Sequence, residues 1–126
     1  MTISPSHASD YFPNDPASVR DARRLVAATL DASGVDPDIP VVVTSELATN
    51  ALKHAETGFQ VSVTVEEDAV RIEVQDGVGA MGLASDIATD AGGHGIRLVE
   101  HFSTEWGVEI RGKDKAVWVR LPRADS

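Results

Sequence analysis

Cysteine is absent from the 126-residue chain, and cations, aromatic side chains and long apolar runs are scarce. Without a thiol, the chain can form no disulfide, no thiolate-bound zinc or iron–sulfur site and no cysteine nucleophile. We therefore expect no redox chemistry from the protein's own side chains.

Basic residues are outnumbered, because 11 Lys and Arg stand against 20 Asp and Glu and give a formal net charge of −9 at pH 7. Such a field repels the phosphate backbone of nucleic acids, so the composition argues against direct DNA or RNA binding. Apolar residues make up 42% of the chain and charged residues 25%, as in ordinary globular proteins. Because the net charge is negative, an anionic ligand would need a site whose local groups attract it.

Apolar runs such as Ile39 to Val43 are far shorter than the roughly 20 residues that span a bilayer. The opening segment, MTISPSHASD, has neither the basic region nor the apolar region of a signal peptide. From these features we expect a cytoplasmic protein with no membrane association.

Length and patterning predict one domain over residues 16–122, preceded by a tail or edge strand over 1–15 and followed by a tail over 123–126. Apolar residues at helical spacing predict helices over Ala17–Ser33 and Ile39–His54. The second of these places Val42 and Leu47 on its apolar side. A third helix is expected to begin at the glycines near position 93 and to end around Ser103.

Strict alternation of apolar and polar residues predicts two antiparallel hairpins, one over residues 59–75 and one over 106–121. With the helices, this order predicts an α+β fold, a two-layer α/β sandwich with three main helices on one face of a mixed, mostly antiparallel sheet. The other sheet face should meet water. Trp118 falls on that face, where it is either exposed or covered by the N-terminal tail.

Three local features could carry chemistry. Glu46 and Asn50 lie four residues apart, and so one above the other on the second helix, and Lys53 and His54 extend this polar stripe by one turn. Asp76 ends a strand on the same face as the apolar residues, so its carboxylate should point inward and needs donors there. Those donors are either backbone N–H groups of the next turn or a ligand.

The third feature is the segment Gly92-Gly93-His94-Gly95, directly before the third helix. Free N–H groups and the positive end of a helix dipole make a helix N-terminus suitable for an anion, and glycines allow a phosphate to approach the backbone. Taken alone, this segment could equally be a flexible connection. The long glycine-rich stretch before it, from Gly77 on, is expected to be a functional loop.

Together the three features resemble the GHKL, or Bergerat-fold, ATP-binding family. SELATNALKHA resembles the family's N box, VQDGVGAMG its first glycine box and GGHGIRLV its second, in the family's order. The resemblance covers roughly Ser18 to Leu121 and is closest to the stand-alone anti-sigma-factor serine/threonine kinases of bacteria, of the actinobacterial type.

The resemblance implies ATP or ADP and Mg²⁺ as cofactors and a role for each motif residue. Asn50 would hold the Mg²⁺, Glu46 would be the catalytic base toward a serine or threonine hydroxyl, and Asp76 would accept from the adenine amino group. The remaining nucleotide-binding positions would be Lys53, His54, Gly77, Gly79, Met81, Gly93, His94, Gly95 and Ile96. Residues 80–92 would form the lid over the nucleotide.

The resemblance further implies a regulator that sequesters a sigma factor and phosphorylates an anti-anti-sigma partner of the STAS type, with homodimerisation a possibility. Two alternatives stay open. No Lys or Arg occurs between Gly77 and Gly93, which favours a nucleotide-binding regulatory module that is catalytically weak or inactive and acts through partners alone. The other alternative is a domain that has lost its ligand. Arg20, Arg23 and Arg24 form the one tight basic cluster, either ordinary surface or a contact for an acidic partner.

Overall fold

The computed structural model describes residues 2–4, 6–54, 57–77 and 94–125. Its elements follow in the order β1 (Thr2–Ser4), β2 (His7–Phe12), α1 (Ala17–Ala32), α2 (Asp38–His54), β3 (Phe59–Val65), β4 (Ala69–Asp76), α4 (His94–Phe102), β5 (Glu105–Arg111) and β6 (Asp114–Pro122). The three predicted helices and the two predicted hairpins are confirmed, with ends that differ from the expected ones by one or two residues.

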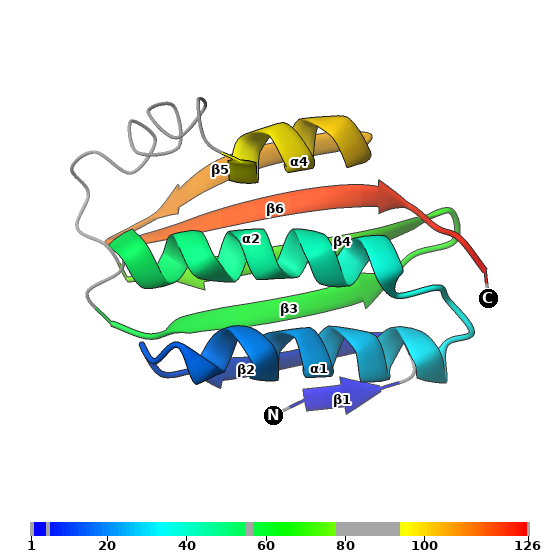
Figure 1. Cartoon of the computed structure of the whole chain (residues 1–126), viewed down its shortest axis with the longest axis horizontal. Coiled ribbons are helices and arrows are strands. Elements are labelled where there is room, and N and C mark those ends of the chain that lie inside the picture. The colour runs from blue at the N-terminus through cyan, green and yellow to red at the C-terminus, as the bar shows by residue number, and fades with distance from the viewer. Residues whose placement is uncertain (1, 5, 55–56, 78–93, 126) are drawn as a thin grey trace.

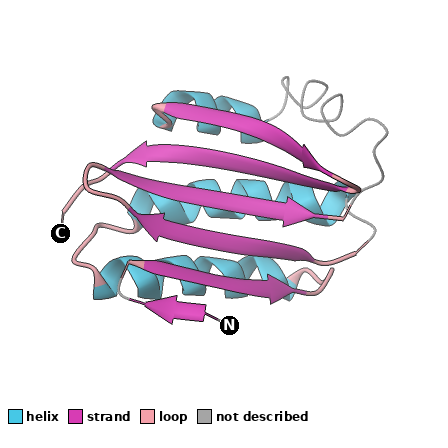
Figure 2. Cartoon of the chain, turned by 180° about the vertical axis from the view of Figure 1, so that it is seen from behind, coloured by secondary structure: helices cyan, strands magenta, loops and turns pink. Residues whose placement is uncertain are grey.

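The elements form two layers. The three helices lie side by side on one face of the sheet (Figure 1), and the view from behind shows the strands of the other face with no described element over them (Figure 2). The strand order is β1-β2-β3-β4-β6-β5, and every described neighbouring pair is antiparallel. The predicted α+β sandwich is confirmed, and the described sheet is antiparallel throughout rather than mixed.

Local signals explain where the first two helices begin and end. The Ala17 N–H, the first of α1, donates to the Asp15 side chain at 2.8 Å, which satisfies a donor that has no partner inside the helix. The helix ends at Ala32, and two residues later Gly34 has a φ of 71°, in the left-handed region that glycine adopts most readily. At the start of α2 the Asp38 N–H donates to the Asp36 side chain at 3.0 Å in the same way.

The N-terminal residues belong to the sheet. β2 pairs with β3 on one side and β1 on the other, so β2 is an inner strand and β1 an edge strand of the described sheet. Phe12 packs against Phe59 with ring centroids 5.8 Å apart. The segment expected as a tail or edge strand thus adds two strands to the sheet.

The core lies between the helices and the sheet. Val61, Ile72 and Val119 point from the strands toward the fully buried Val26 of α1 and Val43 of α2. Burying such side chains is the main stabilising contribution in a domain of this size. None of the described helices has both the length and the apolar composition needed to cross a bilayer.

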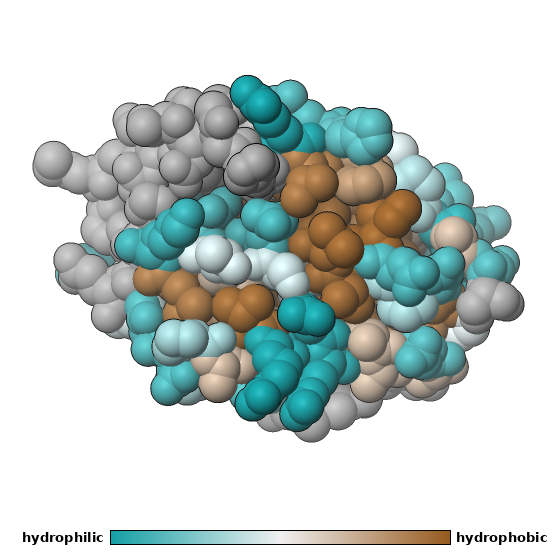
Figure 3. Space-filling model, viewed as in Figure 1, coloured by the Kyte–Doolittle hydropathy of each residue, from teal (hydrophilic) through white to brown (hydrophobic). Residues whose placement is uncertain are grey.

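The expected apolar side of α2 is confirmed at Leu47 and wrong at Val42. Val42 is 44% exposed, as is Ile39, whereas Thr44 is fully buried and donates its hydroxyl to the Pro40 carbonyl at 2.8 Å. The hydroxyl is satisfied within the helix, so a threonine can take an inner position. Apolar surface accordingly runs from α4 across the first half of α2 (Figure 3).

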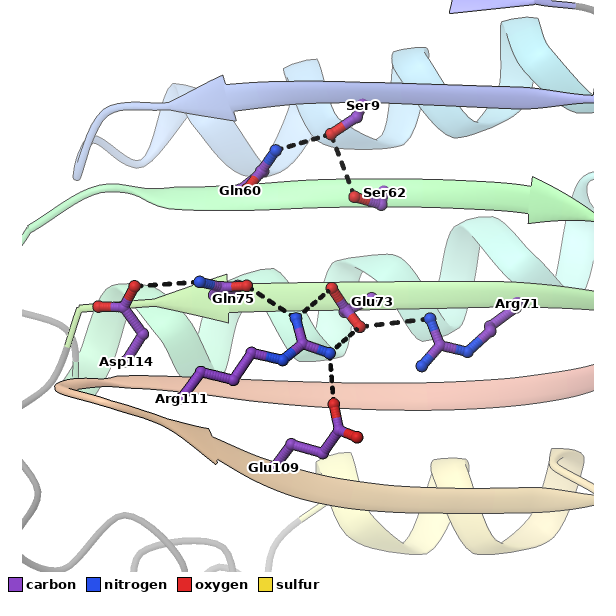
Figure 4. A network of polar contacts seen from close by, with 9 residues as sticks. All are labelled: Ser9, Gln60, Ser62, Arg71, Glu73, Gln75, Glu109, Arg111 and Asp114. Atoms are coloured by element: carbon purple, nitrogen blue, oxygen red, sulfur yellow. Dashed lines mark hydrogen bonds and ion pairs between the residues drawn. The ribbon is translucent and has the colours of Figure 1, made fainter. Parts of the chain in front are cut away.

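The open sheet face carries polar residues that are joined in a network (Figure 4). Arg111 donates to Glu73 at 3.0 Å and to Gln75 at 2.9 Å. Trp118, on the same face, is half-buried, with the Arg71 guanidinium 5.4 Å from its ring centroid. The N-terminal strands lie beyond β3 and β4 from Trp118, so Arg71, and not the N-terminal segment, covers the ring.

Candidate functional site

The three chemical features of the sequence meet at one end of the fold. α2 ends there at His54, β4 ends there at Asp76, and α4 begins there at His94 (Figure 1). Gly79, Met81 and Gly93, and the predicted lid over residues 80–92, lie outside the described residues. The site can therefore be built from α2, the end of β4 and the first turn of α4.

Asp76 is the innermost polar group of this site. Its side chain is 3% exposed and belongs to the helix-facing side of the sheet, so the predicted inward orientation is confirmed. On neighbouring strands it stands opposite Phe59 and Lys115. The Lys115 Nζ is 4.0 Å from Asp76 Oδ2, which gives the carboxylate a cationic neighbour.

Sequence reasoning missed Lys115. The signal that identifies it is the alternation of β6, because Lys115 lies two residues before Val117 and therefore on the same inner face. The side chain is 4% exposed. Lysine is seldom buried unless it is paired, and here the buried Asp76 carboxylate is its charged neighbour.

Glu46 and Asn50 are both half-buried on α2, and Lys53 is exposed near the end of the helix. Leu47 and Ala51, the residues that follow them, are buried against the sheet. The polar stripe therefore borders the core without entering it, as the four-residue spacing predicted. A ligand resting on this end of the fold would meet the amide and the carboxylate together.

α4 begins within the predicted glycine segment, and His94, Gly95 and Ile96 form its first turn. The N–H groups of a first turn have no partner inside the helix, and the helix dipole makes this end positive. The first turn contains no acidic residue that would oppose an anion. This end of α4 is thus suited to hold phosphate.

Gly77 follows Asp76 directly and lies close to its neighbours. A Cβ at this position would stand 2.9 Å from Thr57 Oγ1 and 3.3 Å from Asp114 Oδ1. A side chain would therefore crowd the rim of the site. A cavity of about 210 Å³ opens at this rim toward the open face of the sheet, and its lining includes no described residue of α2 or α4; it is formed by Tyr11, Thr57, Gly58, Gln60, Gln75, Asp76, Gly77 and Asp114.

These groups fit a purine nucleotide with Mg²⁺. Asp76 offers a buried acceptor for an exocyclic amine, and the first turn of α4 offers backbone donors for phosphates. No cluster of three or more acidic or histidine side chains occurs within the described ranges. Mg²⁺ is usually held by one or two protein oxygens together with substrate phosphates, so the side-chain oxygen of Asn50 fits the ion without such a cluster.

Comparison with known proteins agrees with this geometry. The sequence model of the histidine kinase-like ATPase domain matches residues 12–121. None of the curated proteins matches the chain. The solved structure of the histidine kinase AdeS from Acinetobacter baumannii superposes with a TM-score of 0.57 and 13% sequence identity, over 94% of this chain and 68% of that chain. At this identity the structural likeness shows the fold alone.

Proposed function

Because the chain belongs to the histidine kinase-like ATPase family, we propose that it binds ATP at the end of the sheet where α2, β4 and α4 meet. Asp76 accepts a hydrogen bond from the adenine amino group, and the first turn of α4 binds the phosphates. Asn50 holds Mg²⁺, which neutralises phosphate charge when bound. The observation that carries the proposal is the buried carboxylate of Asp76 at this end of the fold.

The proposed biochemical role is that of an anti-sigma-type regulator. It transfers a phosphoryl group from ATP to a serine or threonine of an anti-anti-sigma partner and, in another state, holds a sigma factor. Glu46 stands one helical turn before Asn50 on the same stripe of α2, next to the proposed metal ligand. There it accepts the proton of the hydroxyl, while the hydroxyl oxygen takes the phosphoryl group and ADP leaves.

Two surface features support binding to partner proteins. Arg20, Arg23 and Arg24 are exposed on α1, where they can meet an acidic partner. The exposed Ile39 and Val42 form part of the apolar surface on α2, and contiguous apolar surface often marks an interaction site. A self-associated form of the chain would be compatible with the same surfaces.

A second candidate is a regulator that binds nucleotide without transferring phosphate. The observation that favours it is the absence of Lys and Arg from residues 78–92, because a lid that stabilises a transferring phosphoryl group commonly supplies a cation. In this case the nucleotide acts by changing which partner-binding conformation is populated.

Calorimetric titration with ATP and ADP, with and without Mg²⁺, tests the nucleotide site. Saturable binding supports it, and a folded protein that binds neither nucleotide refutes it. Radiolabelled phosphate transfer from ATP to an anti-anti-sigma domain then separates the two candidates. Glu46→Gln should abolish this transfer and leave ATP binding within about twofold; transfer that survives the substitution would reject Glu46 as the base.

A further inference from the structure

Lys115 is the one buried cation among the described residues, and the proposed function gives it no task. It lies on β6 directly opposite Asp76 of β4, at the rim of the sheet where the nucleotide site is proposed. The neighbouring inward positions along β6 are the apolar Val117 and Val119. A purely structural side chain at this position could be apolar as well.

A buried ion pair contributes little net free energy to holding two strands together. Removing both charges from water costs several kcal/mol for each ion, and such pairs are often no more stabilising than apolar residues of similar volume. The pair also lacks ideal contact, because 4.0 Å exceeds the N–H···O distance of a hydrogen bond. An ammonium has three N–H donors, so Lys115 can donate to a further partner beside Asp76.

We propose that Lys115 and Asp76 together recognise the adenine base. The Lys115 ammonium donates to the ring nitrogen N1, and the Asp76 carboxylate accepts from the neighbouring amino group N6. This inference rests on the proposed ATP site. On that edge of adenine an acceptor and a donor lie side by side. The described site offers the complementary pair, a donor on β6 and an acceptor on β4.

The arrangement also selects between purines. Guanine carries an acceptor at position 6 and a donor at position 1, the reverse of adenine. In the same pose its oxygen would face Asp76 and its N–H would face Lys115. An acceptor would then face the Asp76 carboxylate, and a donor would face the Lys115 ammonium. Both buried groups would lose their hydrogen bonds, and a site with unpaired polar groups rejects such a ligand strongly.

Adenine analogues test the contact on the wild-type protein. In 1-deaza-ADP the N1 acceptor is replaced by C–H, and 7-deaza-ADP is the control that keeps both N1 and N6. Calorimetry should find 7-deaza-ADP within about threefold of ADP and 1-deaza-ADP weaker by about tenfold or more. Equal affinity for ADP and 1-deaza-ADP would overturn the role of Lys115.

Lys115→Met removes the donor and keeps most of the side-chain volume. This variant should bind ADP more weakly and should no longer distinguish ADP from 1-deaza-ADP. Lys113→Met is the matched control, because Lys113 is exposed in the turn two residues away, and it should keep both the affinity and the discrimination. Discrimination that persists in Lys115→Met would contradict the proposal.

The outcomes separate this inference from the proposed function. A wild-type protein that binds no adenine nucleotide refutes both. A wild-type protein that binds ADP but ignores the loss of N1 keeps the ATP site and refutes only the contact with Lys115. If Lys115→Met does not fold, equal affinity of the wild type for ADP and 1-deaza-ADP still refutes the contact with Lys115.

Discussion

Lys115 and Asp76 face each other across β6 and β4, with Nζ and Oδ2 4.0 Å apart and side chains 4% and 3% exposed. Because both charges are buried, substituting either residue takes a neighbouring opposite charge away from the other. Loss of nucleotide binding in an Asp76 variant could therefore arise from a lost contact with the ligand or from a destabilised fold. Stability has to be measured beside affinity.

The first prediction concerns this pair. Without nucleotide, Lys115→Met should lower the free energy of unfolding by roughly 3–5 kcal/mol, because the buried Asp76 carboxylate loses its cationic neighbour. Adding Asp76→Asn should recover part of that loss, since the double variant buries neither charge. Urea unfolding followed by circular dichroism measures both. A double variant less stable than Lys115→Met would show that the two side chains do not interact in this way.

The second prediction concerns Mg²⁺. Asn50→Ala should leave ADP binding without Mg²⁺ within about twofold, because the base contacts remain, and should abolish the gain in affinity that Mg²⁺ gives to the wild type. Calorimetry with and without Mg²⁺ measures this difference. Thr49→Ala, one position away on α2, is the control and should keep the gain. Retention of the gain in Asn50→Ala would exclude Asn50 as the metal ligand.

The third prediction concerns Glu73 on the open sheet face. Burial acts to raise the pKa of Glu73, but the hydrogen bond and charge of Arg111, with those of Arg71, outweigh it and lower the pKa. A carboxyl with a lowered pKa stabilises the fold above its unfolded pKa of roughly 4.3, and this contribution is lost as the pH falls through the folded pKa.

Glu73→Gln should therefore lose less stability than the wild type as the pH falls below about 5, and should be less stable at neutral pH by up to about 1 kcal/mol. Urea midpoints at several pH values measure the difference. Parallel pH profiles for the two proteins would show that Glu73 contributes nothing to acid unfolding.

The fourth prediction concerns Gly58, just before β3. A Cβ there would stand 2.2 Å from the Phe12 carbonyl oxygen, and backbone cannot move aside cheaply. Gly58→Ala should lower the free energy of unfolding by about 1–3 kcal/mol or more, because it overpacks the end of β2. In Gly77→Ala the contact is with the Thr57 hydroxyl, which can rotate. Thermal melting should thus find Gly77→Ala the milder variant.

Local patterns predicted much of the fold because they depend on neighbours in the chain. Side chains repeat their direction about every 3.6 residues in a helix and every two residues in a strand. The first period predicts α1 from Ala22, Val26 and Leu30, and the second predicts β3 and β4 from their alternation. Counting by twos along β4 likewise predicted that Asp76 points to the inner face of the sheet. The four-residue spacing of Glu46 and Asn50 predicted that both lie on one stripe of α2.

Other features depend on pairing between distant segments. The helices, the hairpins and the inward direction of Asp76 follow from the periods of single elements and could be predicted from the sequence. Three features could not: β2 is an inner strand, Arg71 covers Trp118, and Lys115 stands opposite Asp76. Register between strands is set by packing of whole faces and by turns, so no local pattern specifies which residue faces which.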